Sequence, residues 1–470
     1  MSKYISCGKY NNYYKYVFLT IFFSLLSNAL FGNWNCNDSN LIFIAQLYPD
    51  EAKTTQLNLS HHIIIHNIYR NFFIIIISII LYNYEKYRTK SEKNEETAKQ
   101  TGSIELIYED LEKELEKKTI LNIILIIILF NIQDILTMFY FQFDLSKFNL
   151  WILELPLLSF FNFKILNIKI YSHHKFAMCL SVIVCLLQRI INFFVIGFSD
   201  DYKEEIYNKY KFLYFIGIIS YLIIIIIRSY TVVKMKIFMD LRYISPTKLL
   251  IINGVIGILI NIIIMLIFSY NKCATIDDID IHLCNIVEDN SNRNESYLEN
   301  IFIYFKILNN GEYYDIIIEV FTSIIGSLVY SFCVYFFILI IKYLSTVHMI
   351  FYSFIYSFCV QVIYTFISLI TDIYPTKQKF NVIIFIFTII ADIFAGFGIC
   401  VYCEIFELNF CNFNYNLRRN IIERGEEDIN NIRKTEHFFN IFDDEKDNES
   451  ENENQQLNYG LLDNNKWDIY

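Results

Sequence analysis

The chain has 470 residues, of which 55% are hydrophobic and 18% aromatic, and its formal net charge is −10. Soluble domains would need polar surface, whereas the apolar residues here come in long blocks, which argues against a soluble protein. Much of the acidic charge lies in residues 84–118 and after Glu404, and no basic face remains outside those segments, which argues against nucleic-acid binding.

Apolar residues form blocks along the chain, and several are almost solid Ile, Leu, Val and Phe. A block of about twenty apolar residues is the length that a helix needs to cross the hydrocarbon core of a bilayer. In chain order the predicted spans are 16–32, 63–83, 119–141, 149–167, 176–198, 210–230, 248–269, 315–341, 345–370 and 381–403. The sequence therefore predicts an all-α polytopic membrane protein with about ten transmembrane helices.

The first two blocks admit a second interpretation. Residues 16–32 form a short block that ends in Asn28-Ala29-Leu30-Phe31-Gly32, so the block could be the apolar region of a cleaved signal peptide, whereas the polar, Tyr-rich residues before it favour a membrane helix. The block 63–83 contains His66 and Arg70, so only its later part is fully apolar. If 16–32 is a signal peptide and 63–83 does not cross, every later segment changes side.

The placement of Lys and Arg favours a cytosolic N-terminus, because cytosolic connections carry more Lys and Arg than the opposite side. The cytosolic segments are then 1–15, the charged loop 84–118, 168–175, 231–247, the short link at Lys342 and the tail 404–470. The predicted transmembrane halves are 16–198 and 210–403, with a lumenal link at 199–209 and a long lumenal loop at 270–314.

Glycosylation sequons and cysteines agree with this orientation. Three N-x-S/T sequons occur on connections that the prediction places in the lumen or outside, and a fourth, at Asn448, falls in the tail. The glycosylation candidates are Asn37, Asn58 and Asn294. Cys273 and Cys284 share the 270–314 loop, where they either form a disulfide in an oxidising compartment or remain two free thiols.

The charged loop and the tail are the expected soluble parts. Residues Ser103 to Lys118 show the periodicity of an amphipathic helix, which would lie on the membrane surface or against the bundle. The tail continues as a helical stretch from Leu417 to Arg433 and becomes acidic and Asn-rich after Asp443, a composition typical of disorder. Tyr459 to Leu462 fits a Tyr-x-x-apolar sorting signal, which a sorting adaptor would bind.

The sequence contains no Walker A loop, no Gly-rich nucleotide fingerprint, no H-E-x-x-H and no G-x-S-x-G, so neither an enzyme nor a cofactor is expected. His173 and His174, followed by Lys175, could suggest a metal site. No carboxylate or Cys lies nearby in sequence, however, and the pair falls at a predicted helix start. We therefore interpret the pair as a polar cap at the membrane interface, and no metal is expected.

Ionisable side chains within spans are costly, and therefore usually face a cavity or a partner. Asp134 and Arg189 lie at comparable depth, so they could pair with each other or bind a charged substrate. Glu154 and Glu319 lie nearer span ends, where they could reach the headgroups, and Asp392 lies mid-span among small residues. The predicted cavity residues are Gln133, Asp134, Gln188, Arg189, Gln361 and Asp392.

Cytosolic ends and a short link after the fourth span suggest a repeat of five plus five spans, and an odd repeat inverts its second copy. In this layout the stretch Phe160 to Leu180 resembles the drug/metabolite transporter superfamily, which includes nucleotide-sugar transporters and chloroquine-resistance-transporter-like proteins. The Ser245-Pro246 step, the Cys-containing lumenal loop and the stretch Glu404 to Cys411 also resemble that superfamily, in a protist or fungal branch. The inserted segment 84–118 departs from its compact members.

The resemblance implies alternating access, in which a central cavity between two halves opens to one side and then to the other. The expected function is transport of a small organic metabolite, in the secretory-pathway, vacuolar or plasma membrane. The alternative is a non-transporting membrane scaffold or receptor that presents its charged loop and tail to cytosolic partners.

Overall fold

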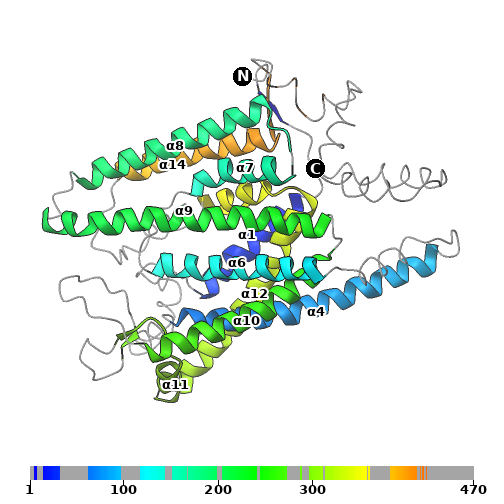
Figure 1. Ribbon diagram of the computed structural model, residues 1–470, viewed down its shortest axis with the longest axis vertical. Helices are drawn as coiled ribbons and strands as arrows, with labels where there is room; N and C mark the ends of the chain where they lie inside the picture. Colours follow the sequence, from blue (N-terminus) through cyan, green and yellow to red (C-terminus); the bar gives the residue numbers. More distant parts are fainter. Residues whose placement is uncertain are drawn as a thin grey trace.

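The computed structural model of the protein consists mainly of long helices that lie side by side (Figure 1). The described residues are 5–7, 14–31, 62–96, 117–142, 151–166, 168–197, 204–240, 244–271, 286–287, 296–310, 313–356, 358–359, 382–409, 413, 415, 417 and 420. The helices are α1 (Tyr14–Phe31), α4 (Ile63–Glu96), α6 (Lys117–Gln142), α7 (Glu154–Leu166), α8 (Ser172–Gly197), α9 (Glu204–Asp240), α10 (Pro246–Tyr270), α11 (Ile301–Asn310), α12 (Tyr313–Tyr343) and α14 (Val382–Tyr402). A 3-10 turn, η2 (Trp151–Leu153), leads into α7, and residues 348–356 are also helical.

Strands are short and form two antiparallel pairs within the described residues. β1 (Ile5–Cys7) pairs with β4 (Phe406–Leu408), with Ile5 opposite Leu408, so the segment before α1 lies beside the segment after α14. β2 (Ile286–Val287) pairs with β3 (Ser296–Tyr297) within the loop 270–314. The protein is therefore an all-α protein with minor strand pairing at the helix ends.

The predicted spans all overlap helices, but several helices have different bounds. α4 continues through Glu96 and α9 through Asp240, so parts of the predicted links 84–118 and 231–247 are helical. The reason is that Lys, Glu and Arg end the apolar stretch without lowering helix propensity much. The loop 270–314 also contains α11, which the apolar-block argument did not predict.

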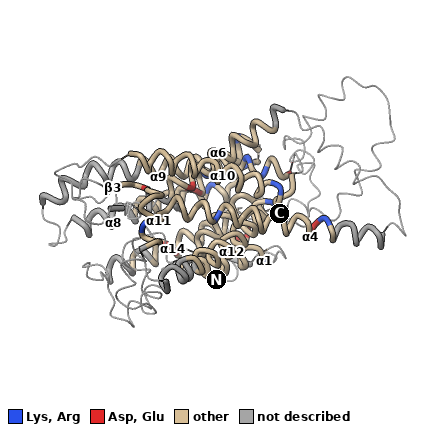
Figure 2. Tube along the Cα trace, turned by 90° about the horizontal axis from the view of Figure 1, so that it is seen from below, with Lys and Arg blue, Asp and Glu red and all other residues tan. Residues whose placement is uncertain are grey.

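Four helices are long and apolar enough to cross a membrane within the described residues, over Ile63–Tyr87, Ile120–Thr137, Pro246–Tyr270 and Ser323–Tyr343. Their outward sides carry large apolar groups: Leu121 is 65% exposed and Ile263 58%. Surfaces of this kind are expected where lipid, and not water, covers the protein. Figure 2 shows long helical stretches without Lys, Arg, Asp or Glu, and charged residues on the projecting part of α4. The protein is membrane-embedded.

α10 shows how the sequence sets a helix boundary. Ser245 is extended and its Oγ accepts a hydrogen bond from the Lys248 amide at 3.2 Å, while Pro246 occupies the first helical turn. The hydroxyl satisfies an amide that has no partner within the helix, and the proline has no amide to satisfy. The predicted start of the seventh span at 248 therefore lies two residues inside the helix.

The helices pack in specific pairs. α4 packs on α10, α8 on α14, α1 on α12, and α6 on α9; further contacts join α4 to α12, α6 to α10, and α7 to both α8 and α9. The largest apolar core includes Ile127 of α6, Leu155 of α7, Val233 of α9, Leu249 of α10 and Ile341 of α12. Helices from both predicted halves therefore share one core.

Five buried asparagines from α4, α6 and α10 form a second kind of contact, which we call the asparagine cluster. Its members are Asn67, Asn71, Asn131, Asn253 and Asn261. Asn131 Nδ2 donates to Asn253 Oδ1 at 3.0 Å, and Asn67 Nδ2 donates to Asn261 Oδ1 at 3.2 Å. These hydrogen bonds between side-chain amides join helices where no water competes for the donors and acceptors.

Polar contacts gather at one end of the bundle, which we call the Lys236 end. Lys236 Nζ donates to the carbonyl of Ile341 at 3.1 Å and pairs with Asp240 at 3.0 Å, so the end of α9 is joined to the end of α12. Glu85 of α4 accepts from Thr247 of α10 at 3.1 Å. These contacts join segments that the sequence placed together on the cytosolic side.

The opposite end, the His62 end, is organised by Glu299. Its carboxylate contacts His62 Nδ1 at 2.5 Å and accepts from the Ile64 amide at 2.9 Å, at the start of α4. A carboxylate at a helix N-terminus satisfies a free amide and opposes the helix dipole. The residues just before α11 are thereby fixed to α4.

Candidate functional site

Four buried or half-buried ionisable residues meet in the interior of the bundle and form what we call the charge cluster: Arg70, Asp134, Glu154 and Arg228. Arg228 Nε lies 3.2 Å from Glu154 Oε1. Asp134 interacts electrostatically with both Arg228 and Arg70. The four residues come from α4, α6, α7 and α9, so the cluster depends on the packed bundle and not on one helix.

Two uncharged side chains complete the cluster. The Arg70 guanidinium lies over the ring of Tyr330 at 4.2 Å from its centroid, in cation–π geometry. Arg228 Nη2 donates to Ser353 Oγ at 3.4 Å. Tyr330 belongs to α12 and Ser353 to the helical segment 348–356, so the cluster draws equally on the two predicted halves of the chain.

Two members of the charge cluster, Arg70 and Asp134, lie away from the ends of their helices. Arg70 is seven residues from the start of α4 at Ile63, and Asp134 is eight residues from the end of α6 at Gln142. At a rise of 1.5 Å per residue, each Cα is about 10 Å or more along its helix from that end. Ionised groups at such positions cost desolvation energy, which makes them candidates for a functional role.

The cluster has formal charge balance, with two guanidinium groups and two carboxylates. Glu154 is 2% exposed and Arg70 5%, whereas the Arg228 side chain remains 30% accessible. A carboxylate or phosphate is the kind of group that could compete with Glu154 for the Arg228 guanidinium. A molecule with an amine could likewise compete for the carboxylates. The arrangement suits reversible recognition of a charged or zwitterionic metabolite.

Of the predicted cavity residues whose side chains are described, one belongs to the charge cluster and two do not. Asp134 is a member of the charge cluster, whereas Gln133 Nε2 donates to Thr137 Oγ1 at 2.9 Å on its own helix. Asp392 is buried on α14, but its neighbours Ala391 and Ala395 pack in a separate apolar cluster with α7, α8 and α9. The structure therefore does not bring Asp392 together with Asp134 through described contacts.

The expectation that Glu154 could reach the headgroups is wrong. Its carboxylate is buried against Arg228, because the turn η2 places the first residue of α7 inside the bundle. Arg228 itself was not singled out from the sequence. It lies near the predicted end of the sixth span at 230, but α9 continues for twelve residues beyond it, to Asp240. The residues that follow Arg228 continue the helix, so that Arg228 lies within it and not at its end; this continuation is the signal that could have identified Arg228.

The structure does not describe the side chains of several other residues that were singled out from the sequence. The side chains of Gln188, Arg189 and Glu319 are not among those described, so the pairing of Arg189 with Asp134 stays a prediction. The following also lie outside the described residues: Gln361, Cys273, Cys284, Asn37, Asn58, Asn294, Asn448 and the signal Tyr459 to Leu462. The same holds for most of the predicted amphipathic helix over 103–118 and of the tail helix over 417–433.

No model of a known protein family matches the chain, and no curated protein is detectably similar to it in sequence.

Proposed function

We propose that the protein is a membrane transporter, which moves a small organic metabolite by alternating access and holds it at the charge cluster. The observation that carries the proposal is the composition of that cluster. Arg70, Asp134 and Glu154 come from the first predicted half, whereas Arg228, Tyr330 and Ser353 come from the second. A substrate site in an inverted-repeat transporter lies between its two halves, near the membrane midplane.

The helix pairing supports an inverted repeat of 16–198 and 210–403 with ten spans. Suppose that each of the first five spans corresponds to the span five later, so that α1 corresponds to α9, α4 to α10, α6 to α12 and α8 to α14. The helix pairs α4·α10 and α8·α14 then each correspond to themselves. The pair α1·α12 then corresponds to α9·α6, and α4·α12 to α10·α6, and all of these pairs are in contact. A two-fold exchange of this kind is expected for inverted repeats and has no reason to arise in an unrelated bundle.

One further correspondence agrees. The contact of α7 with α9 has its counterpart in the contact between the segment 348–356 and α1, where Phe351 and Tyr352 pack beside Val17 and Ile21.

The pairing of β1 with β4 supports placing the segments before α1 and after α14 on one side, as an even number of crossings requires. We propose that this side is the cytosol, and that the membrane belongs to the secretory pathway, the vacuole or the cell surface. The drug/metabolite transporter superfamily has this general organisation, and we propose membership of a divergent branch.

Flux measurements test the proposal. The full chain is reconstituted in liposomes and screened with labelled nucleotide sugars, amino acids and small peptides. We expect uptake of one class, lost in Arg228→Gln and in Asp134→Asn. Asp240→Asn, which alters a carboxylate outside the charge cluster, serves as the matched control and is expected to retain uptake.

Two results would count against transport at this site. No uptake of any class by folded protein would favour the scaffold or receptor, which presents the loop and tail to partners. Uptake that persists at the wild-type rate in both cluster variants would place the substrate elsewhere in the bundle.

A further inference from the structure

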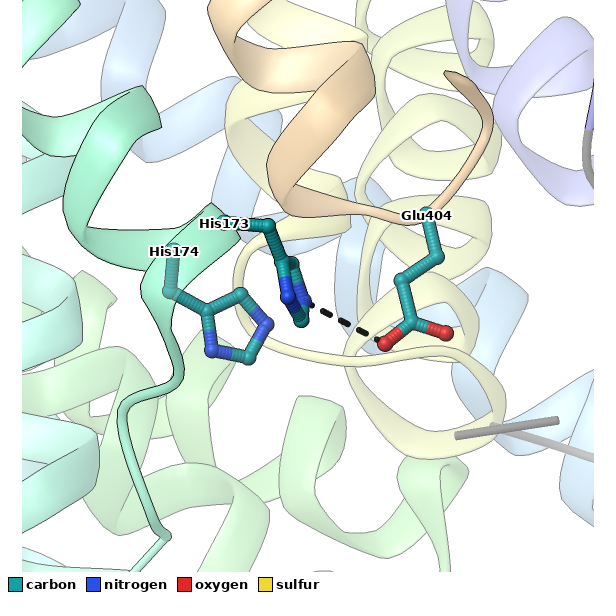
Figure 3. Close-up of side chains that lie close together, drawn as sticks. All are labelled: His173, His174 and Glu404. Carbon is teal, nitrogen blue, oxygen red and sulfur yellow. Dashed lines mark ion pairs between the residues drawn. The ribbon is translucent and has the colours of Figure 1, made fainter. Parts of the chain in front are cut away.

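Two histidines and a glutamate from distant parts of the chain meet where α8 begins and α14 ends (Figure 3). His173 Nε2 lies 3.4 Å from Glu404 Oε1, and the rings of His173 and His174 have centroids 4.0 Å apart. One donor atom from each residue lies within 4.8 Å of the other two. Among the described residues, no other group of three His, Cys, Asp or Glu side chains is arranged in this way.

His173 provides an independent reason to expect a ligand. Its side chain is 1% exposed, and neither ring nitrogen makes a hydrogen bond with the described residues. A buried imidazole that forms no hydrogen bond loses its hydration, and here only Nε2 has a carboxylate beside it, at 3.4 Å. Figure 3 shows this ring facing the Glu404 carboxylate, with Nε2 as the nearer nitrogen, so both groups could coordinate a cation bound between them.

The backbone fixes the direction of the Glu404 side chain. Glu404 has φ 57°, the left-handed conformation that usually ends a helix at glycine. The amide of Ile405 donates back to the carbonyl of Cys400 at 2.8 Å, which closes the end of α14. The chain thus turns sharply at Glu404, and the carboxylate is directed at the first turn of α8.

His174 is also held in place. The ring of Tyr402 stacks on it with centroids 4.4 Å apart, and the Tyr171 amide donates to His174 Nδ1 at 3.3 Å. Coordination through Nδ1 would use the lone pair that accepts this bond, and coordination through Nε2 would put the ring proton on Nδ1. Metal binding therefore replaces the Tyr171 hydrogen bond in either case.

The donor set selects a class of ion. Two imidazole nitrogens and one carboxylate oxygen suit zinc and other divalent transition metals, whereas calcium and magnesium prefer oxygen donors only. Zinc bonds of about 2.0–2.1 Å in a tetrahedral site place neighbouring donors about 3.3 Å apart. The His173–Glu404 separation of 3.4 Å already fits, and the separations that involve His174, which are at most 4.8 Å, have to shorten to this spacing on binding.

We propose that His173, His174 and Glu404 bind one divalent transition metal ion of the zinc type, with a fourth position left to water or another ligand. The ion would connect the start of α8 to the segment that continues into β4, and β4 pairs with β1. The site would thus cross-link the ends of α8 and α14. It does not depend on transport through the bundle.

Zinc binding to the full chain tests this. Protein purified in detergent without a polyhistidine tag is stripped with a chelator, titrated with Zn²⁺ by calorimetry, and analysed for zinc by mass spectrometry. We expect one zinc per chain for the wild type and loss of stoichiometric binding in His173→Gln and in Glu404→Gln. Glu407→Gln, which changes a carboxylate three residues further along the same segment, is the matched control and should bind normally.

A second readout avoids the variants. Co²⁺ added to the stripped wild-type protein should give the visible absorption bands of a low-symmetry four-coordinate site, and Zn²⁺ should displace them. Absence of these bands, or less than one zinc per chain in monodisperse wild-type protein, would overturn the proposal. Binding by folded Glu404→Gln with wild-type affinity would overturn it too, because that variant lacks an anionic donor.

Discussion

The asparagine cluster and the charge cluster are two solutions to the same problem, a polar group buried between helices. In the first, neutral amides donate to one another or to carbonyls, as Asn131 does to Asn253 and Asn261 to the Gly257 carbonyl at 2.7 Å. In the second, guanidinium and carboxylate groups face each other. Neutral amides are sufficient to join α4, α6 and α10, so packing alone does not require ions. The costlier charge cluster therefore needs another reason, and the substrate recognition proposed above would supply one.

The largest expected effect comes from Glu154→Gln, which leaves the Arg228 guanidinium without its carboxylate partner. Breaking a buried ion pair on one side costs about 3 kcal/mol, at the low end of the usual range, when the remaining charge is mostly desolvated; the Arg228 side chain is only 30% accessible. We expect the free energy of unfolding in detergent to fall by that order. The double variant Glu154→Gln, Arg228→Gln should regain much of the lost free energy of unfolding. If the double variant is destabilised by the sum of the two single changes, the two side chains do not interact as an ion pair.

The next effect concerns the close approach of α10 to the asparagine cluster. A Cβ at Gly257 would lie 2.6 Å from the Oδ1 atoms of both Asn131 and Asn71. We therefore expect Gly257→Ala to destabilise the protein by about 2 kcal/mol, in the range of overpacked cores. Gly398→Ala is the matched control, because its nearest neighbour, Leu180 Cδ2, would be 3.4 Å away. Thermal unfolding that ranks the two variants the other way round would contradict this packing.

The smallest effect separates the two clusters most directly. In a double-mutant cycle of Asn131→Ala and Asn253→Ala, we expect a coupling energy of about 0.6 kcal/mol, typical of hydrogen bonds between membrane helices. Under the proposed function, uptake should persist in both single variants. A coupling as large as that between Glu154 and Arg228 would show that the two clusters do not differ in the way proposed.

Much of the fold follows from apolarity alone. α6 was predicted as 119–141 and is observed as Lys117–Gln142; α10 was predicted as 248–269 and is observed as Pro246–Tyr270. Hydropathy locates such helices because lipid demands a continuous apolar stretch. It does not locate helix ends that extend into polar surroundings, which is why α4 and α9 exceed their predicted lengths.

The candidate sites were less predictable. Asp134 could be selected because a carboxylate deep in a span is rare, but its electrostatic interactions with Arg70 and Arg228 depend on how separate helices pack. The same limit applies to Glu404, which meets His173 only because α14 ends beside the start of α8. A single sequence reveals the unusual residue and its depth; its partner is fixed by tertiary contacts that local patterns do not encode.

The crowding around Gly257 has a consequence for how this sequence can diverge. Because the amides of Asn71 and Asn131 fill the space that any side chain at 257 would need, a larger residue there becomes acceptable only after both asparagines have shortened. The three positions should therefore change together across descendants of this protein, with glycine retained wherever both asparagines remain. Such co-variation would link three helices, and could be recognised in an alignment before any further structure is determined.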